Sequence, residues 1–316
     1  MSKIIEINNI SKQYFIKNNF FSTNKKNIVK AINNVSFDVH ENQTIGLIGL
    51  NGAGKSTLIK IILGILKVDE GEIKVFDNNP IKNRIKNLFD IGVIFGQKTQ
   101  LRWDLSPLDS YKLNKELYNI DNTIFNENLK KYSDILDLHE FINRPVRTLS
   151  LGQKMRADLM SALLHKPKLL ILDEPTIGVD IFSKRKIIDL IKDLKKSTTI
   201  IFTSHNLNEV YEIADKILIL DKGNLVVNEN KENLLKETDY LSLNLFLNDN
   251  LVYDYNKFKN IEVIKNNEYE YIFKFIPKNQ LKNFIDFLYS SNKVNFFEIK
   301  ENNLEKILKD ITNEEI

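Results

Sequence analysis

Cysteine is absent from the 316 residues of this chain. Its absence excludes disulfides and thiolate metal sites, and no other feature indicates an oxidising compartment. Only four residues are histidine, and because they are scattered along the sequence we expect no metal site built from them.

Long hydrophobic runs are missing as well. No segment approaches the roughly 20 apolar residues that a helix needs to span a bilayer. The N-terminus carries an acid at Glu6 and lacks the apolar stretch of a signal peptide. We therefore expect a soluble, cytoplasmic protein whose work at a membrane would need a separate subunit.

An excess of one charge is also missing, since 45 lysines and arginines oppose 42 acidic residues and the formal net charge is +3. A balance this close to neutral argues against nucleic acid as the main partner, and no direct nucleic-acid contact is expected. The length is enough for one large α/β domain and a smaller second one.

The first 227 residues alternate apolar runs with helical patterns, which predicts a doubly wound α/β core. Residues 169–172 form a continuous apolar run of the kind found in central parallel strands. Residues 3–10 have the mixed pattern of an edge strand, and the polar residues 17–30 predict a loop. Residues 107–165 read as helical.

The composition shifts near residue 228, which predicts a second domain over 228–316. Its pattern has the order β-α-β-β-α-β, a ferredoxin-like α+β arrangement. The predicted strands are 241–247, 261–264, 269–276 and 294–299, the helices are 251–258 and 280–289, and a last helix covers 303–312.

Residues 49–57 read G-L-N-G-A-G-K-S-T and match the phosphate-loop pattern G-x-x-x-x-G-K-[ST]. A predicted strand precedes the loop and a helix follows it, as this interpretation requires. The alternative is a glycine-rich turn before an ordinary helix. Lys55 would bridge the β- and γ-phosphates, and the Ser56 hydroxyl would ligate Mg²⁺. The backbone N–H groups would surround the nucleotide phosphates, over a stretch that contains Gly49, Asn51, Gly52, Ala53, Gly54 and Thr57.

Asp173 and Glu174 follow the apolar run 169–172 directly. The carboxylates therefore emerge at the C-terminal edge of the sheet, where open α/β sheets bind ligands. Asp173 suits a hard cation, directly or through water. Glu174 is the candidate general base that accepts a proton from an attacking water.

Together with Gln97, the stretch L-S-L-G-Q at 149–153, Asp180 and His205, these motifs make residues 4–225 resemble the ATPase subunit of an ABC transporter. The resemblance implies a P-loop NTPase cassette with a mixed sheet core and a helical subdomain at about 100–165. It implies ATP and Mg²⁺ as ligands, and a dimer that encloses two Mg-ATP.

The same resemblance assigns roles to the remaining motifs. Gln97 would touch Mg²⁺ and the lytic water, and His205 would hydrogen-bond the γ-phosphate. Asp180 would couple the two sites of the dimer. Ser150, Gly152 and Gln153 would belong to the signature that faces the γ-phosphate of the opposite subunit, with Leu151 in place of the family's first signature glycine.

Two aromatic positions carry open alternatives. Tyr14 is the expected adenine-stacking residue. Phe15 is the alternative stacking residue, and the simpler structural explanation is a position in the domain core. Trp103, the only tryptophan, is either a contact for a membrane permease or part of the domain core.

The resemblance further implies permease subunits as partners, either a homodimer or a heterodimer with a second cassette, and a peripheral position on the inner face of the cell membrane. The stretch G-Q-K-T-Q-L-R-W-D-L at 96–105 resembles exporters of the daunorubicin-resistance type. Two other classes stay open. A soluble ABC ATPase acting on nucleic acid or ribosomes would favour insertions that this chain lacks, and a low-turnover regulatory module remains compatible with Leu151.

Overall fold

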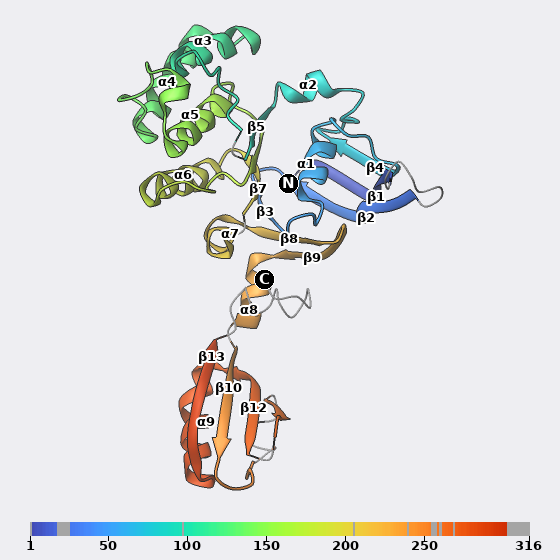
Figure 1. The fold of residues 1–316 in the computed structure, drawn as a ribbon, viewed down its shortest axis with the longest axis vertical. Coiled ribbons are helices and arrows are strands. Elements are labelled where there is room, and N and C mark those ends of the chain that lie inside the picture. Colours follow the sequence, from blue (N-terminus) through green and yellow to red (C-terminus); the bar gives the residue numbers. More distant parts are fainter. Residues whose placement is uncertain are drawn as a thin grey trace. The chain divides into compact units, whose positions relative to one another are not determined.

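The computed structural model describes residues 2–17, 26–96, 98–204, 206–238, 240–253, 258, 261–267 and 269–301. The chain divides into two compact units, Met1–Glu229 and Asn230–Ile316 (Figure 1). Each unit has its own hydrophobic core.

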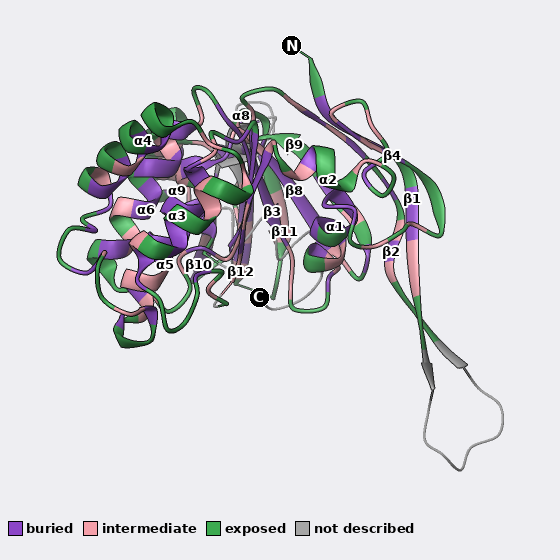
Figure 2. Ribbon diagram, turned by 90° about the horizontal axis from the view of Figure 1, so that it is seen from above, coloured by how far each residue is buried: buried purple, intermediate pink, exposed green. Residues whose placement is uncertain are grey.

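The N-terminal unit is built on a six-stranded sheet with the order β5-β6-β7-β3-β8-β9. The pairs from β5 to β8 are parallel, and a turn at 222–223 joins β8 to β9. The inner strands are apolar and buried, which fits a sheet covered on both faces (Figure 2). The strands are β3 (Thr44–Ile48), β5 (Ile91–Phe95), β6 (Leu169–Asp173), β7 (Thr199–Thr203), β8 (Lys216–Asp221) and β9 (Asn224–Asn230).

A separate antiparallel sheet with the order β2-β1-β4 packs on the same core. Its strands are β1 (Lys3–Lys17), β2 (Lys26–His40) and β4 (Glu70–Val75). The edge-strand prediction for residues 3–10 is wrong, because β1 lies between β2 and β4 and buries Ile5 and Ile7. The loop prediction is wrong for Lys17, which ends β1, and for residues 26–30, which β2 includes. Residues 18–25 lie outside the described part.

Helices cover both faces of the six-stranded sheet. Helix α1 lies on one side, and helices α3 to α6 lie on the other (Figures 1 and 2). Their starts follow capping chemistry: Ser106 caps α3 ahead of a proline, and Asp121 caps α4. The helices are α1 (Lys55–Ile62), α2 (Arg84–Leu88), α3 (Pro107–Leu117), α4 (Asn122–Ile135), α5 (Leu151–Leu163), α6 (Ile181–Leu194) and α7 (Leu207–Ile213).

The C-terminal unit begins with α8 (Lys231–Thr238) and contains a four-stranded antiparallel sheet with the order β11-β12-β10-β13. Its strands are β10 (Tyr240–Leu247), β11 (Glu262–Lys265), β12 (Glu270–Pro277) and β13 (Val294–Glu301), and α9 (Leu281–Ser291) packs on its core through Phe284 and Leu288. Residues 251–253 are not helical, and the rest of the helix predicted at 251–258 lies mostly outside the described residues. The helix predicted at 303–312 also lies outside them.

Across the described parts of both units, no helix is both long enough and apolar enough to cross a bilayer.

Candidate nucleotide-binding and hydrolysis site

The site is assembled by four neighbouring parallel strands that end in one row. Leu47 of β3 pairs with Thr203 of β7, Thr203 pairs with Asp173 of β6, and Asp173 pairs with Phe95 of β5. The segments that follow these strands therefore start at the same edge of the sheet. They are the phosphate loop and the segments that begin at Gly96, Glu174 and Ser204.

The phosphate loop runs from β3 into α1 and depends on glycines in left-handed backbone. Gly54 has a φ of 111°, and a Cβ there would lie 2.3 Å from the carbonyl oxygen of Ala31. Gly52 has a φ of 85°, yet a Cβ there would meet no atom within 4 Å. Gly54 is thus required by a close backbone approach, whereas Gly52 faces open space in which an anion can approach the loop.

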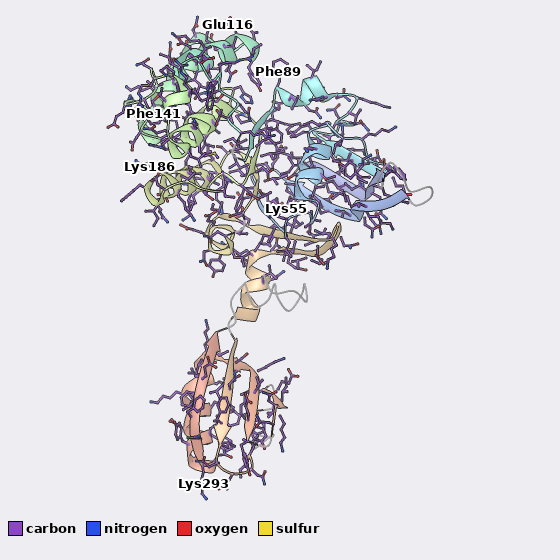
Figure 3. All side chains as sticks on the ribbon, in the orientation of Figure 1. Lys55, Phe89, Glu116, Phe141, Lys186 and Lys293 are labelled. Atoms are coloured by element: carbon purple, nitrogen blue, oxygen red, sulfur yellow. The ribbon has the colours of Figure 1, made fainter. Side chains whose placement is uncertain are left out.

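Lys55, labelled in Figure 3, has its side chain held inside the loop by hydrogen bonds. It is only 7 % exposed, and its Nζ donates hydrogen bonds to the carbonyl oxygens of Gly49 at 2.5 Å and Leu50 at 3.2 Å. Burial lowers the pKa of the Lys55 ammonium, while the carboxylates of Glu174 and Asp173 oppose that change. A phosphate anion at the loop would favour the charged ammonium further, because opposite charges attract strongly in a partly buried site.

Asp173 lies at the centre of the oxygen ligands suited to a divalent cation. The Ser56 hydroxyl lies 3.4 Å from Asp173 Oδ2, and the Thr203 hydroxyl donates to Asp173 Oδ1 at 2.7 Å. A hydroxyl and a carboxylate that converge in this way are the hard ligands that Mg²⁺ prefers, together with phosphate oxygens. The donor set therefore fits Mg²⁺ carried by a nucleotide.

Glu174 sits in strained backbone, with a φ of 53°. Its N–H donates to the Thr203 hydroxyl at 2.9 Å, so one hydroxyl contacts both acidic residues. Thr203 is fully buried. Left-handed backbone at a residue other than glycine is costly, and the surrounding bonds must hold it in place. Thr203 thereby fixes the direction in which the Glu174 side chain leaves the sheet edge.

A buried carboxylate, Glu209, lies next to Glu174, which is itself only partly buried. It accepts hydrogen bonds from the hydroxyls of Thr176 at 2.6 Å and Ser204 at 2.8 Å, and it forms an ion pair with Lys184. These residues and Glu174 line a pocket of about 170 Å³. Glu209 thus joins the segment after Glu174 to the segment before residue 205.

The signature segment begins a regular helix. Ser150 caps α5 by accepting from the Gln153 N–H at 3.2 Å, and the Gln153 side chain accepts from the Ser150 N–H at 3.0 Å. This capping box satisfies two amides at the helix start. Leu151 is the first helical residue and has no positive φ, so the side chain that replaces a glycine there leaves the backbone helical.

Gly152 lets α5 approach the start of α6. A Cβ at this position would lie 2.7 Å from Asp180 Oδ2 and 3.0 Å from Ser183 Oγ. Asp180 caps α6 by accepting from the N–H groups of Phe182 and Ser183, and the hydrogen bonds from Ser183 lower the pKa of its carboxyl. The signature and Asp180 are therefore neighbours within one chain.

The signature lies away from the phosphate loop of the same chain. Helices α5 and α1 are on opposite sides of the six-stranded sheet in both views (Figures 1 and 2). In the described part of the chain, Ser150 and Gln153 make regular helical hydrogen bonds. Their other hydrogen bonds join these two residues to each other. Within one chain, the signature and the phosphate loop are therefore separate from each other.

The remaining predicted residues fall into two groups. Tyr14 and Phe15, near the end of β1, are both exposed, which rules out a core position for either. Gln97 and His205 lie outside the described residues, so their predicted roles stay predictions. Asn51, Ala53 and Thr57 lie in the loop or in the first turn of α1.

Three residues that the sequence analysis did not single out belong to the site or border it, namely Thr203, Glu209 and Asp158. Thr203 is the last residue of a buried strand and Glu209 follows that strand, so their positions on either side of the predicted His205 were the available signal. Asp158 is an acid on the buried face of a predicted helix, and an acid in that place was a signal in itself.

Residues 32–177 match the family described as ABC transporter. The energy-coupling factor transporter ATP-binding protein EcfA of Malacoplasma penetrans is 30 % identical over 76 % of this chain and 80 % of its own. The linearmycin resistance ATP-binding protein LnrL of Bacillus subtilis is 33 % identical over 73 % of this chain and 70 % of its own. A solved ATP-binding subunit of an ABC transporter shares the fold, with a TM-score of 0.65, 22 % identity, and coverage of 74 % of this chain and 92 % of its own.

Proposed function

The chain belongs to the ABC transporter family of ATP-binding proteins, and on that premise we propose that it drives separate permease subunits by hydrolysing ATP. ATP with Mg²⁺ is the nucleotide of this family, and the protein is an ATPase. The observation that carries the proposal is the single row of strand ends, which brings the phosphate loop, Asp173 and Glu174 to one edge.

Each residue at this edge has a chemical task. Lys55 and the loop amides would hold the β- and γ-phosphates. Ser56 and Asp173 would hold Mg²⁺, which would supply positive charge against the negative charge of the phosphoryl group. Glu174 accepts the proton of the attacking water, in a direction fixed by Thr203. Gln97 and His205 complete the set. Gln97 would contact Mg²⁺ and the attacking water, and His205 would contact the γ-phosphate.

The active form that we propose is a dimer, with either a second copy or a second cassette. The separation of the signature from the phosphate loop supports this arrangement, because the capped start of α5 can then serve the partner's nucleotide. The surface beside it supports the same arrangement. Ile181 and Phe182, which follow Asp180, are 76 % and 80 % exposed, an unusual exposure for large apolar side chains.

The transporter context is proposed from the relatives' names. EcfA is named for an energy-coupling factor transporter and LnrL for resistance to linearmycin, which support a permease partner and export of an antibiotic-like compound. A place in the daunorubicin-resistance type of exporter rests on LnrL and on the stretch 96–105. The chain would then lie at the cytoplasmic face of the cell membrane. Trp103, 54 % exposed, supports a permease contact near this stretch and not a core position.

For the C-terminal unit we propose a ferredoxin-like accessory or regulatory domain. The strand order β11-β12-β10-β13, antiparallel throughout, supports this, since it places the first and third strands of the unit at the centre. We propose Tyr14 as the residue that stacks on adenine. Its exposure at the end of β1 leaves the ring face accessible.

Glu174→Gln tests the function directly. Glutamine keeps the size of the side chain but accepts no proton, so turnover of ATP should fall by about 10²- to 10⁴-fold while ATP binding is retained. The matched control is Glu116→Gln on α3, whose side chain is 75 % exposed and whose turnover should equal that of the unaltered protein.

Equal turnover in Glu174→Gln would remove Glu174 from the base role. An unaltered chain that binds ATP without turnover, alone and with its permease, would favour the regulatory module instead.

A further inference from the structure

Asp158 is a buried carboxylate on the signature helix α5, outside the hydrolysis site. It is 5 % exposed and lies two turns after Ser150. Its Oδ1 accepts a hydrogen bond from the Thr99 hydroxyl at 3.0 Å and another from the Gln100 N–H at 2.9 Å. The two residues that donate to it, Thr99 and Gln100, begin two positions after Gln97.

Thr99 and Gln100 belong to a segment, 99–105, that is also hydrogen-bonded to β5, the strand before Gln97. The Gln100 side chain donates to the carbonyl oxygen of Val93 on β5. Consequently the segment is fixed to the sheet and to α5 just after the position expected to contact Mg²⁺ and the lytic water.

Further contacts join the later part of the same segment to the residues that border the signature. The Lys154 ammonium lies 4.5 Å from the centre of the Trp103 ring, a cation–π contact. The N–H of Arg147 donates to the carbonyl oxygen of Trp103 at 3.0 Å, and the N–H of Val146 donates to that of Leu105 at 2.9 Å. The segment 99–105 therefore contacts residues on both sides of the signature in sequence, at 146–147 and at 154–158.

The carboxyl of Asp158 is costly to bury. Burial raises the pKa of its carboxyl to about 6, against the opposing hydrogen bonds from Gln100 and Thr99. A carboxylate this deeply buried opposes folding unless its hydrogen bonds compensate. An apolar side chain at the same place on α5 would avoid that cost, but it could not bind residues 99 and 100.

We propose that Asp158 is a positioning residue for ATP hydrolysis, which makes the segment 99–105 and the signature helix move as one body. A displacement of the exposed Trp103, or of the segment at Gln97, then reaches Ser150 at the start of α5. Asp158 touches no reacting atom in this scheme and acts through the residues that it holds. The inference rests on the proposed function, because it concerns the coupling of permease contact to hydrolysis.

The test uses the full-length chain and three variants. Asp158→Ala removes both hydrogen bonds. Asp158→Asn keeps an oxygen at the Oδ1 position, and it is the conservative variant expected to restore them. Ser161→Ala is the matched control, because Ser161 is buried on the same helix but accepts its hydrogen bond from Asn114 of α3 at 2.7 Å.

For each variant, ATP affinity is measured by equilibrium titration, ATP turnover by phosphate release, and amide hydrogen exchange by mass spectrometry. Asp158→Ala should lower kcat by about tenfold and leave ATP affinity within about twofold, since the phosphate loop is on another element. Exchange should rise at residues 99–101, where Gln100 loses the acceptor of its N–H. Asp158→Asn and Ser161→Ala should keep kcat within about threefold of the unaltered chain.

Unchanged turnover in Asp158→Ala, or an equal loss in Ser161→Ala, would overturn the positioning role. If Asp158→Ala fails to fold, Thr99→Val replaces it, because valine keeps the shape without the hydroxyl. This variant should lower kcat by about threefold, and unchanged turnover would again overturn the proposal. If the unaltered chain does not hydrolyse ATP, the proposed function is refuted instead. The amide exchange at residues 99–101 would still show whether Asp158 holds Thr99 and Gln100.

Discussion

Replacing Asp158 by asparagine should change how the stability of the N-terminal unit depends on pH. The ordinary pKa of an aspartate is 3.8, and burial raises the pKa of Asp158 to about 6. Because the folded state binds the proton more tightly than the unfolded state, Asp158 contributes stability that is fully present below pH 3.8. That contribution is lost as the pH rises through about 6.

The size of the effect follows from the difference between the two pKa values. Each unit of pKa difference corresponds to 1.36 kcal/mol, so the full titration is worth about 3 kcal/mol, of which about 2 kcal/mol is lost between pH 4 and pH 7. Asparagine does not titrate. The charged and titratable groups around the carboxyl are Lys154 on α5 and Tyr111 on α3, and both are common to the variant and the unaltered chain. The free energy of unfolding of Asp158→Asn should therefore rise relative to the unaltered chain by about 2 kcal/mol from pH 4 to pH 7.

The assay is urea unfolding at a series of pH values, followed by the fluorescence of Trp103, the only tryptophan. Trp103 lies in the N-terminal unit, so it reports the transition of the unit that contains Asp158. The difference between variant and unaltered chain cancels the titration of the groups common to both. A difference that stays constant from pH 4 to pH 7 would refute the view that the Asp158 carboxylate is desolvated. A difference that falls with rising pH would refute the sign of its pKa shift.

Two further variants test the hydrolysis site. Thr203→Val should lower the free energy of unfolding by about 1–3 kcal/mol, because it leaves the Glu174 N–H and Asp173 without their shared hydroxyl, and should lower turnover as well. Urea unfolding and phosphate release measure both effects, and Thr203→Ser, which keeps the hydroxyl, should lose much less. Lys55→Ala should weaken ATP binding by about 10- to 100-fold, since it removes a charge-assisted contact to phosphate. Titration with a fluorescent ATP analogue measures this, and unchanged affinity would contradict the phosphate-loop assignment.

Most of the fold of the N-terminal unit follows from local patterns. Short apolar runs such as 169–172 have one physical solution, a strand buried on both faces. The pattern G-x-x-x-x-G-K-[ST] then places Lys55 and Ser56 at a helix start, where the structure has them. The separate sheet β2-β1-β4 was not predictable in this way. β1 and β2 are consecutive, but β4 follows only after β3 and α1, and only tertiary packing decides that β1 lies in the middle.

The candidate site was predictable where motif and element agree. Asp173 and Glu174 follow from the end of a buried strand, but the role of Thr203 does not, because it depends on which strands are neighbours. The pairing of Asp173 with Thr203 arises from the strand order, which no local pattern encodes. The same reason applies to Asp158, whose partners Thr99 and Gln100 are about 60 residues away in sequence.

The most direct test of the central claim, that two cassettes enclose the nucleotide, is the mass in solution of Glu174→Gln with saturating Mg-ATP, measured by multi-angle light scattering. Binding without hydrolysis should trap the closed form, so the account predicts twice the mass of one chain with ATP and the mass of one chain without it. Adding Lys55→Ala to the same variant should abolish the shift, because ATP binding is weakened. A mass of one chain at saturating ATP, with no second cassette to pair with, would contradict the account.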